Sequence, residues 1–157
     1  MSRAFVRDDD PSGGAAVLPD RPISPHPNLV TQRGRQLIEA RVAEFEHRLA
    51  EVADNTEAQA RAARELRYWT ARLATARVEL PPAALSSARF ATTVICVDAS
   101  GHEARYAIVG EDEAEPNIGR IAWTSPVARA LLGSEPGDLR QLPKGEVEIV
   151  AIEQIEE

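Results

Sequence analysis

The stretch that decides the fold is IEARVAEFEHRLAEV, residues 38–52, followed after a short polar break by AARELRYWTARLATA, residues 62–76. In the first stretch the apolar residues are spaced 4, 3, 4 and 3 apart, at Ile38, Val42, Phe45, Leu49 and Val52. The second stretch repeats this spacing at Ala62, Leu66, Trp69, Leu73 and Ala76, with Leu80 four residues further on. Such spacing lines up one apolar stripe along an α-helix. Two stripes so close in sequence predict an antiparallel helical hairpin.

The ends of the second helix are predicted from its flanking residues. Thr56 with Gln59, or Asp54 with Glu57, fits a capping box, so either pair would start the helix here. Pro81 and Pro82 should end it, because proline has no amide hydrogen and its ring clashes with the preceding turn. About 20 residues per arm at a rise of 1.5 Å give a rod of roughly 30 Å. A hairpin this long and narrow indicates an element that reaches toward a partner.

The chain divides into three predicted parts. Residues 1–30 are predicted to be a flexible tail, because Asp8–Gly14 is polar and the four prolines from Pro19 to Pro27 remove amide donors. Only Leu29 and Val30 are expected to contact the rest of the protein. Residues 31–82 form the predicted hairpin, and residues 83–157 form a C-terminal domain.

The C-terminal part changes from helical to alternating periodicity. Strands are predicted over residues 90–97, 103–109, 118–123 and 147–155, where β-branched residues are frequent. Ser125 and Pro126 suit the cap and the first position of a short helix, which Gly133 would stop. The fold class is therefore α+β, with an N-terminal helical hairpin followed by a small sheet of about four strands and one short helix.

Composition excludes several classes of protein. The 157 residues carry a net charge of −7, and residues 81–157 hold thirteen acids against five Arg and one Lys. This acidic half disfavours direct binding to duplex DNA and suits a protein partner with a basic surface. One cysteine, Cys96, excludes an internal disulfide, and three scattered histidines argue against a metalloenzyme. We find neither an apolar signal core nor a membrane-spanning run, so we expect a cytoplasmic protein without membrane contact.

The C-terminal motifs resemble those of the Gre family of bacterial transcription elongation factors (GreA/GreB). In order, they are Ile108-Val109-Gly110, Asp112-Glu113, Ser125-Pro126-Val127-Ala128-Arg129-Ala130-Leu131, Gly137-Asp138 and Gly145-Glu146. The resemblance covers residues 90–155, and the opening residues 1–6 also resemble those of GreB-type proteins. It implies an antiparallel coiled coil joined to an FKBP-like sheet domain, in agreement with the organisation inferred from periodicity.

The resemblance also implies a function. Gre factors dock on RNA polymerase through the C-terminal domain, and their hairpin enters the secondary channel, where acidic tip residues help to hold a catalytic Mg²⁺. The protein would then be an accessory factor and not an enzyme, a monomer with no cofactor of its own, and it would contact nucleic acid only through the elongation complex. The implied partner-binding residues are Ile108, Gly110, Asp112, Glu113, Ser125, Pro126, Arg129 and Leu131.

The tip of the hairpin departs from the family pattern. Cleavage factors carry Gly-Asp-x-x-Glu-Asn-x-x-Tyr there, whereas this chain keeps the two acids, Asp54 and Glu57, without the glycine, asparagine and tyrosine. The first arm is also shorter than in those factors. The sequence therefore leaves two modes of action open, namely stimulated cleavage of backtracked RNA and regulation without cleavage. The sequence is also compatible with a nucleoside diphosphate kinase regulator-like protein or a coiled-coil interaction scaffold. A prolyl isomerase is the least supported alternative, because its pocket needs aromatic residues and this domain has few.

Overall fold

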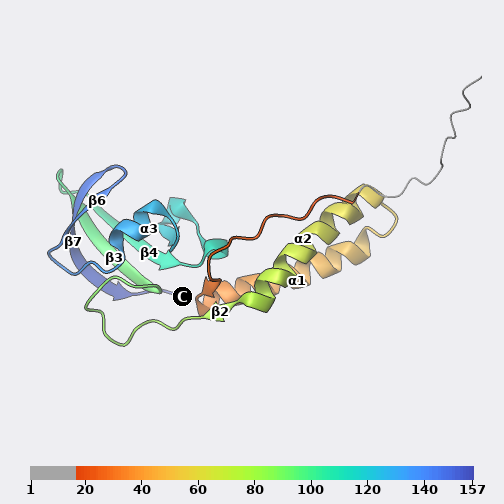
Figure 1. Cartoon of the computed structure of the whole chain (residues 1–157), viewed down its shortest axis with the longest axis horizontal. Helices are drawn as coiled ribbons and strands as arrows, with labels where there is room; N and C mark the ends of the chain where they lie inside the picture. Colours follow the sequence, from red (N-terminus) through yellow and green to blue (C-terminus); the bar gives the residue numbers. More distant parts are fainter. Residues whose placement is uncertain (1–16) are drawn as a thin grey trace, which may run out of the picture.

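The computed structural model describes residues 17–157 and shows an elongated molecule with a helical hairpin at one end and a sheet domain at the other (Figure 1). The hairpin consists of α1 (Gln32–Glu51) and α2 (Thr56–Thr75), each 20 residues long. Ile38, Phe45 and Trp69 are buried between the helices, at positions of the predicted stripes. The predicted helical hairpin is thus confirmed.

Each helix of the hairpin begins at a polar cap. The Oγ1 of Thr31 accepts a hydrogen bond from the Gly34 amide at 3.0 Å and caps α1. The Oδ1 of Asn55 accepts from the Ala58 amide, also at 3.0 Å, and caps α2. The predicted capping boxes at Thr56 and Asp54 are therefore wrong. Thr56 is already the first helical residue, so the amide side chain just before it takes the capping position.

The second helix ends earlier than the prolines predicted. It stops at Thr75, where the Nδ2 of Asn28 donates to the carbonyl of Arg72 at 2.7 Å. The chain then forms β2 (Arg77–Val78), which pairs in parallel with β1 (Leu29–Val30). This pairing uses backbone groups that a longer helix would need. Leu80, expected on the apolar stripe, is consequently 74% exposed.

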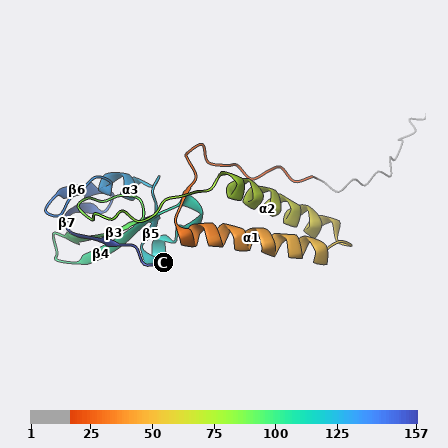
Figure 2. The ribbon, with the colours of Figure 1, turned by 90° about the horizontal axis from the view of Figure 1, so that it is seen from below.

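Residues 17–28, which we call the strap, run along α2 toward the tip of the hairpin (Figure 2). Arg21 pairs with Glu65 at 2.7 Å and lies over the ring of Tyr68 at 3.8 Å. Asp20 accepts from Arg67 at 2.6 Å. The expectation of a flexible tail is corrected for residues 17–28, because their charged side chains find partners on α2. Leu29 and Val30 contact the rest of the protein, as expected. Residues 1–16 of that predicted tail lie outside the described residues.

The sheet domain contains five strands in the order β5-β4-β3-β7-β6. They are β3 (Thr92–Asp98), β4 (Glu103–Val109), β5 (Arg120–Ala122), β6 (Leu139–Leu142) and β7 (Gly145–Gln154). Within this sheet, only β4 and β5 pair in parallel. The sequence predicted about four strands and missed β6, because this edge strand has only four residues and a mostly exposed pattern.

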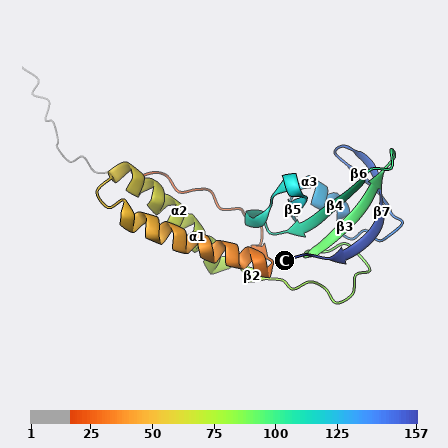
Figure 3. The same cartoon turned by 180° about the vertical axis from the view of Figure 1, so that it is seen from behind.

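One short helix, α3 (Pro126–Leu131), packs on one side of the sheet (Figure 3). The Oγ of Ser125 accepts from the Ala128 amide, so the predicted cap and first position are confirmed. The core between α3 and the sheet contains Val94, Cys96, Ile108, Ile121, Ala128, Leu131, Leu142, Ile149 and Ile152. The observed α+β architecture matches the predicted fold class. Within residues 17–157, none of the helices combines the length and the apolar character needed to cross a bilayer.

We predict that Gly34→Ala destabilises the protein although alanine is the better helix former. A Cβ at residue 34 would overlap the carboxylate of Glu113, which is itself buried. We expect a loss of about 1–3 kcal/mol in the free energy of unfolding, typical of overpacking. Urea unfolding measures it, with Gln36→Ala on the exposed side of α1 as the control. A variant as stable as the wild type would show that this contact is not needed.

Candidate functional site

The two predicted tip acids lie at the end of the hairpin farthest from the sheet domain. Asp54 is in the connecting loop and Glu57 is in the first turn of α2, and both are exposed. Glu57 accepts a hydrogen bond from Arg61, one turn along α2. Hard cations such as Mg²⁺ favour about six oxygen ligands, which two exposed carboxylates do not supply. Within the part of the chain that the structure describes, no group of three or more His, Cys, Asp or Glu side chains is arranged to hold a metal ion.

The second acidic cluster lies where the hairpin meets the sheet domain, in the 3₁₀ turn η1 (Glu111–Glu113). Asp112 accepts from the hydroxyl of Tyr68 at 2.6 Å and from the Nε of Arg72. Arg72 is only 2% exposed, so its charge needs this carboxylate in place of water. Burial and the hydrogen bond to Asp112 raise the pKa of Tyr68 to about 12. The phenol thus stays protonated and keeps donating through the neutral pH range.

Glu113 makes the corresponding contact to α1. Its carboxylate accepts from the amide and hydroxyl of Thr31, the capping residue of α1, at 3.3 and 2.8 Å. It also accepts from the Nη2 of Arg120 on β5 at 2.7 Å. All three residues are buried. One carboxylate therefore connects the start of the hairpin with the edge of the sheet.

Glu111 extends the same junction to the strap. The hydroxyls of Ser24 and Thr124 each donate to its Oε1 at 3.0 Å. Nearby, the ring of His26 meets the ring of Trp123 edge to face, with centroids 5.8 Å apart. The strap, the hairpin and the sheet domain thus meet at three consecutive acidic residues.

This geometry places several of the predicted partner-binding residues inside the protein. Ile108 and Leu131 are fully buried in the core, so their side chains are not accessible on the surface of this chain. Gly110 is also buried, and a Cβ there would lie 2.5 Å from the carbonyl oxygen of Leu29. Asp112 and Glu113 are engaged within the chain, as described above. The acidic motif holds the two parts together and does not present free charge to a partner.

Three of the predicted partner-binding residues retain an accessible position. Pro126 and Arg129 are exposed on α3, and Ser125 is partly exposed at its start. The hydroxyl of Ser125 is already used in capping the helix. Arg129 is therefore the predicted residue whose charge is most available to a second molecule.

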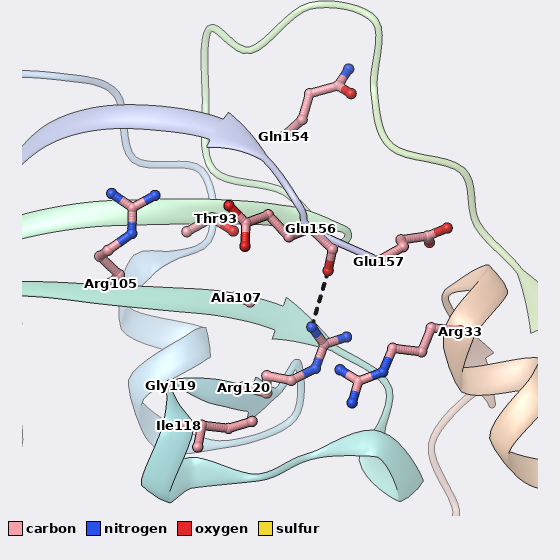
Figure 4. Close-up of a pocket in the computed structure, with 10 residues that line it drawn as sticks. All are labelled: Arg33, Thr93, Arg105, Ala107, Ile118, Gly119, Arg120, Gln154, Glu156 and Glu157. Carbon is pink, nitrogen blue, oxygen red and sulfur yellow. Dashed lines mark hydrogen bonds between the residues drawn. The ribbon is translucent and has the colours of Figure 1, made fainter.

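A cleft of about 550 Å³ lies beside the junction, between the start of α1 and a face of the sheet formed by β3, β4, β5 and the end of β7 (Figure 4). Arg33 and Arg120 extend into it from α1 and β5, and Arg105 lines it from β4. Arg120 donates to the carbonyl of Glu156 at 3.2 Å. The side chains of Glu156 and Glu157 line the same cleft, so positive and negative charges are mixed there. Its electrostatics do not select one kind of ligand.

Sequence reasoning missed the residues that complete the junction, namely Thr31, Tyr68, Arg72 and Arg120. One signal was present, because Tyr68 and Arg72 are four residues apart and so share one face of a helix. An arginine on the inner face of a short hairpin indicates a buried acidic partner. Nothing in the local sequence shows that this partner lies 40 residues further along the chain.

Taken together, the fold defines a class of protein in which a projecting helical hairpin is held firmly on a small mixed-sheet domain. Residues 83–155 match the family model for the C-terminal domain of the GreA/GreB transcription elongation factors. GreA from Methylococcus capsulatus is 55% identical over 58 residues, which cover 34% of this chain and 37% of that protein. GreA from Alkalilimnicola ehrlichii is 51% identical over 67 residues, covering 41% of this chain and 42% of the relative.

Over residues 83–155 the chain is therefore similar to the C-terminal domain of the Gre family. The matching regions span less than half the length of these curated relatives. Among solved structures, GreA factor homolog 1 (Gfh1) of Thermus thermophilus aligns over 81% of this chain and 99% of its own, with 21% identity and a TM-score of 0.38. A GreA/GreB factor from Nitrosomonas europaea aligns over 79% and 97%, with 23% identity and the same TM-score.

We predict that Asp112→Ala strongly destabilises the protein, because Arg72 would remain buried without a charged partner. Glu111 is 3.6 Å from Arg72, which is too far for a good hydrogen bond. Removing one member of a buried ion pair costs about 3–5 kcal/mol. Chemical unfolding measures the loss. Glu103→Ala, on the exposed side of β4, serves as the control and should change stability little.

Proposed function

We propose that this protein is a transcription elongation factor of the Gre type that binds RNA polymerase. Its C-terminal domain would dock on the enzyme and its hairpin would enter the secondary channel. The observation that carries the proposal is the family match over residues 83–155, on a domain that holds a hairpin of two 20-residue helices. The buried contacts of Asp112 and Glu113 support it, because they fix the direction in which the hairpin projects.

Within this function we favour regulation by occupying the channel over strong stimulation of RNA cleavage. Each helix of the hairpin is about 30 Å long. The first helix is shorter than in the cleavage factors, and every residue that it lacks shortens the reach of the tip by about 1.5 Å. Metal coordination tolerates only a few tenths of an ångström. Glu57 is also paired with Arg61, which would have to release it before it could serve as a ligand.

Cleavage of backtracked RNA provides the test of the tip. The double variant Asp54→Ala/Glu57→Ala is compared with the wild type in backtracked elongation complexes of the cognate polymerase with Mg²⁺. We expect both proteins to bind equally and to produce little shortened RNA. The control is Glu39→Ala/Glu46→Ala, which removes two exposed acids from α1. Cleavage that the wild type stimulates and the tip variant loses would instead identify Asp54 and Glu57 as contributors of metal ligands.

The docking surface gives a separate prediction. Arg129→Glu on exposed α3 should weaken binding to the polymerase by about tenfold or more, since reversing a charge in an interface introduces repulsion. Arg35→Glu is the matched control, because the Arg35 side chain is 43% exposed near the base of α1, and it should bind like the wild type. Affinity is measured by fluorescence anisotropy. A wild-type protein that does not bind the polymerase at all would point to a nucleoside diphosphate kinase regulator-like protein or a coiled-coil scaffold.

A further inference from the structure

The burial of the strap repeats every three residues. Three partly buried residues stand three positions apart, namely Leu18, Arg21 and Ser24. A proline follows each of them and is exposed, at Pro19, Pro22 and Pro25. Three residues per turn is the repeat of the polyproline II helix, so residues at this spacing share one edge of the chain. The strap therefore has one edge of anchoring side chains and one edge of exposed prolines.

The first two anchors contact α2. Leu18 lines a small pocket together with Gln59. Arg21 pairs with Glu65 at 2.7 Å, and its guanidinium lies 3.8 Å from the centre of the Tyr68 ring. One turn of polyproline II spans about 9 Å, and the six positions from Gln59 to Glu65 span about the same distance along an α-helix. The spacing of the anchors thus matches that of their contacts on α2.

The other end of the strap is attached to the sheet domain. The hydroxyl of Ser24 donates to Glu111 at 3.0 Å. The ring of His26 meets the ring of Trp123 edge to face, with centroids 5.8 Å apart. The strap runs from these contacts along α2 toward the tip (Figure 2). It therefore links the hairpin to the sheet domain by a second path, in addition to the buried ion pairs of the junction.

A second link holds an angle only if it is stiff. Proline fixes the backbone angle φ and so reduces the number of conformations that a released segment can adopt. Because Pro19, Pro22 and Pro25 are exposed, their role is not to pack against the protein. A flexible segment with the same anchors would lose more conformational entropy on docking. The composition of the strap thus favours a stiff, extended connection.

We propose that the strap is a preformed brace that fixes the direction of the hairpin relative to the sheet domain, with Arg21 as its anchor on α2. Both helices are otherwise attached to the sheet domain at one short turn, η1. Parts of a chain that share a small interface are expected to move relative to each other. Keeping the tip aimed at the channel is a consequence that rests on the proposed function, whereas the brace itself does not.

Pulsed electron paramagnetic resonance on the full-length protein tests the brace without polymerase. Spin labels are attached at Ala50→Cys near the tip and at Asn117→Cys in the sheet domain, since both positions are exposed. The native Cys96 stays in place, because it is fully buried and burial raises the pKa of its thiol. We expect one narrow distribution of distances. Arg21→Ala should widen it by about twofold or more, because the two parts then share only the small interface at the junction.

Arg41→Ala is the matched control. Arg41 also lies near the Trp69 ring, 6.0 Å from its centroid, and pairs with Glu44, but both of its charged contacts stay within the hairpin. This variant should leave the width of the distribution unchanged. Circular dichroism checks that each variant keeps its helices.

Two further variants separate a brace from a segment that only stabilises α2. Ser24→Ala/His26→Ala frees the strap from the sheet domain while Arg21 stays on α2, and it should widen the distribution as Arg21→Ala does. Pro22→Gly keeps the anchors but removes stiffness, and it should widen the distribution to a smaller extent.

A width that stays at the wild-type value in Arg21→Ala, or in the Ser24→Ala/His26→Ala variant, would overturn the proposal. A wild-type distribution as wide as those of the variants would do the same. A Pro22→Gly protein with the wild-type width would show that the brace is not preformed. Failure of the proposed function would appear separately, as a wild-type protein that does not bind the polymerase.

Discussion

The carboxylate of Glu113 connects parts of the molecule that are far apart in the sequence. It accepts from Thr31 at the start of α1 and from Arg120 on β5, and the absence of a side chain at Gly34 leaves room for it. Next to it, Asp112 accepts from Tyr68 and Arg72 on α2. Both helices of the hairpin are therefore attached to one short turn of the sheet domain. These buried charges therefore help to fix the direction of the hairpin.

This attachment suits an element that has to project. A helical hairpin with a single stripe of apolar contacts is not wide enough to hold a fixed angle by itself. Buried ion pairs with several hydrogen bonds are directional, and breaking one leaves an uncompensated charge. The strap adds a second constraint, because Arg21 and Asp20 hold it to α2 while Ser24 and His26 contact the sheet domain. The proposed Gre-type function, which requires the tip to point in a fixed direction, would benefit from both the buried ion pairs and the strap.

The arrangement of charge at the tip of the hairpin differs from that at the junction with the sheet domain. Asp54 and Glu57 are exposed, and a cavity lined by arginines lies one to two turns away. At the base, acids and bases are paired and buried. At the tip, they stay available for exchange with other groups, whether those belong to the same chain or to a partner.

The sequence by itself determined the two helices, the α+β class and the cap of α3, because these follow from local periodicity and from residues next to each other. Its motifs in residues 108–146 also predicted the similarity to the Gre family, which the family match over residues 83–155 confirms. Only the tertiary structure decided what those motifs do. The resemblance implied that Asp112 and Glu113 bind a partner, yet both are paired within the chain, with residues 40 and 82 positions away. Likewise α2 ends before Pro81 and Pro82, because the residues that follow it pair with β1. Such long-range pairings depend on how the elements meet in space, which local sequence does not encode.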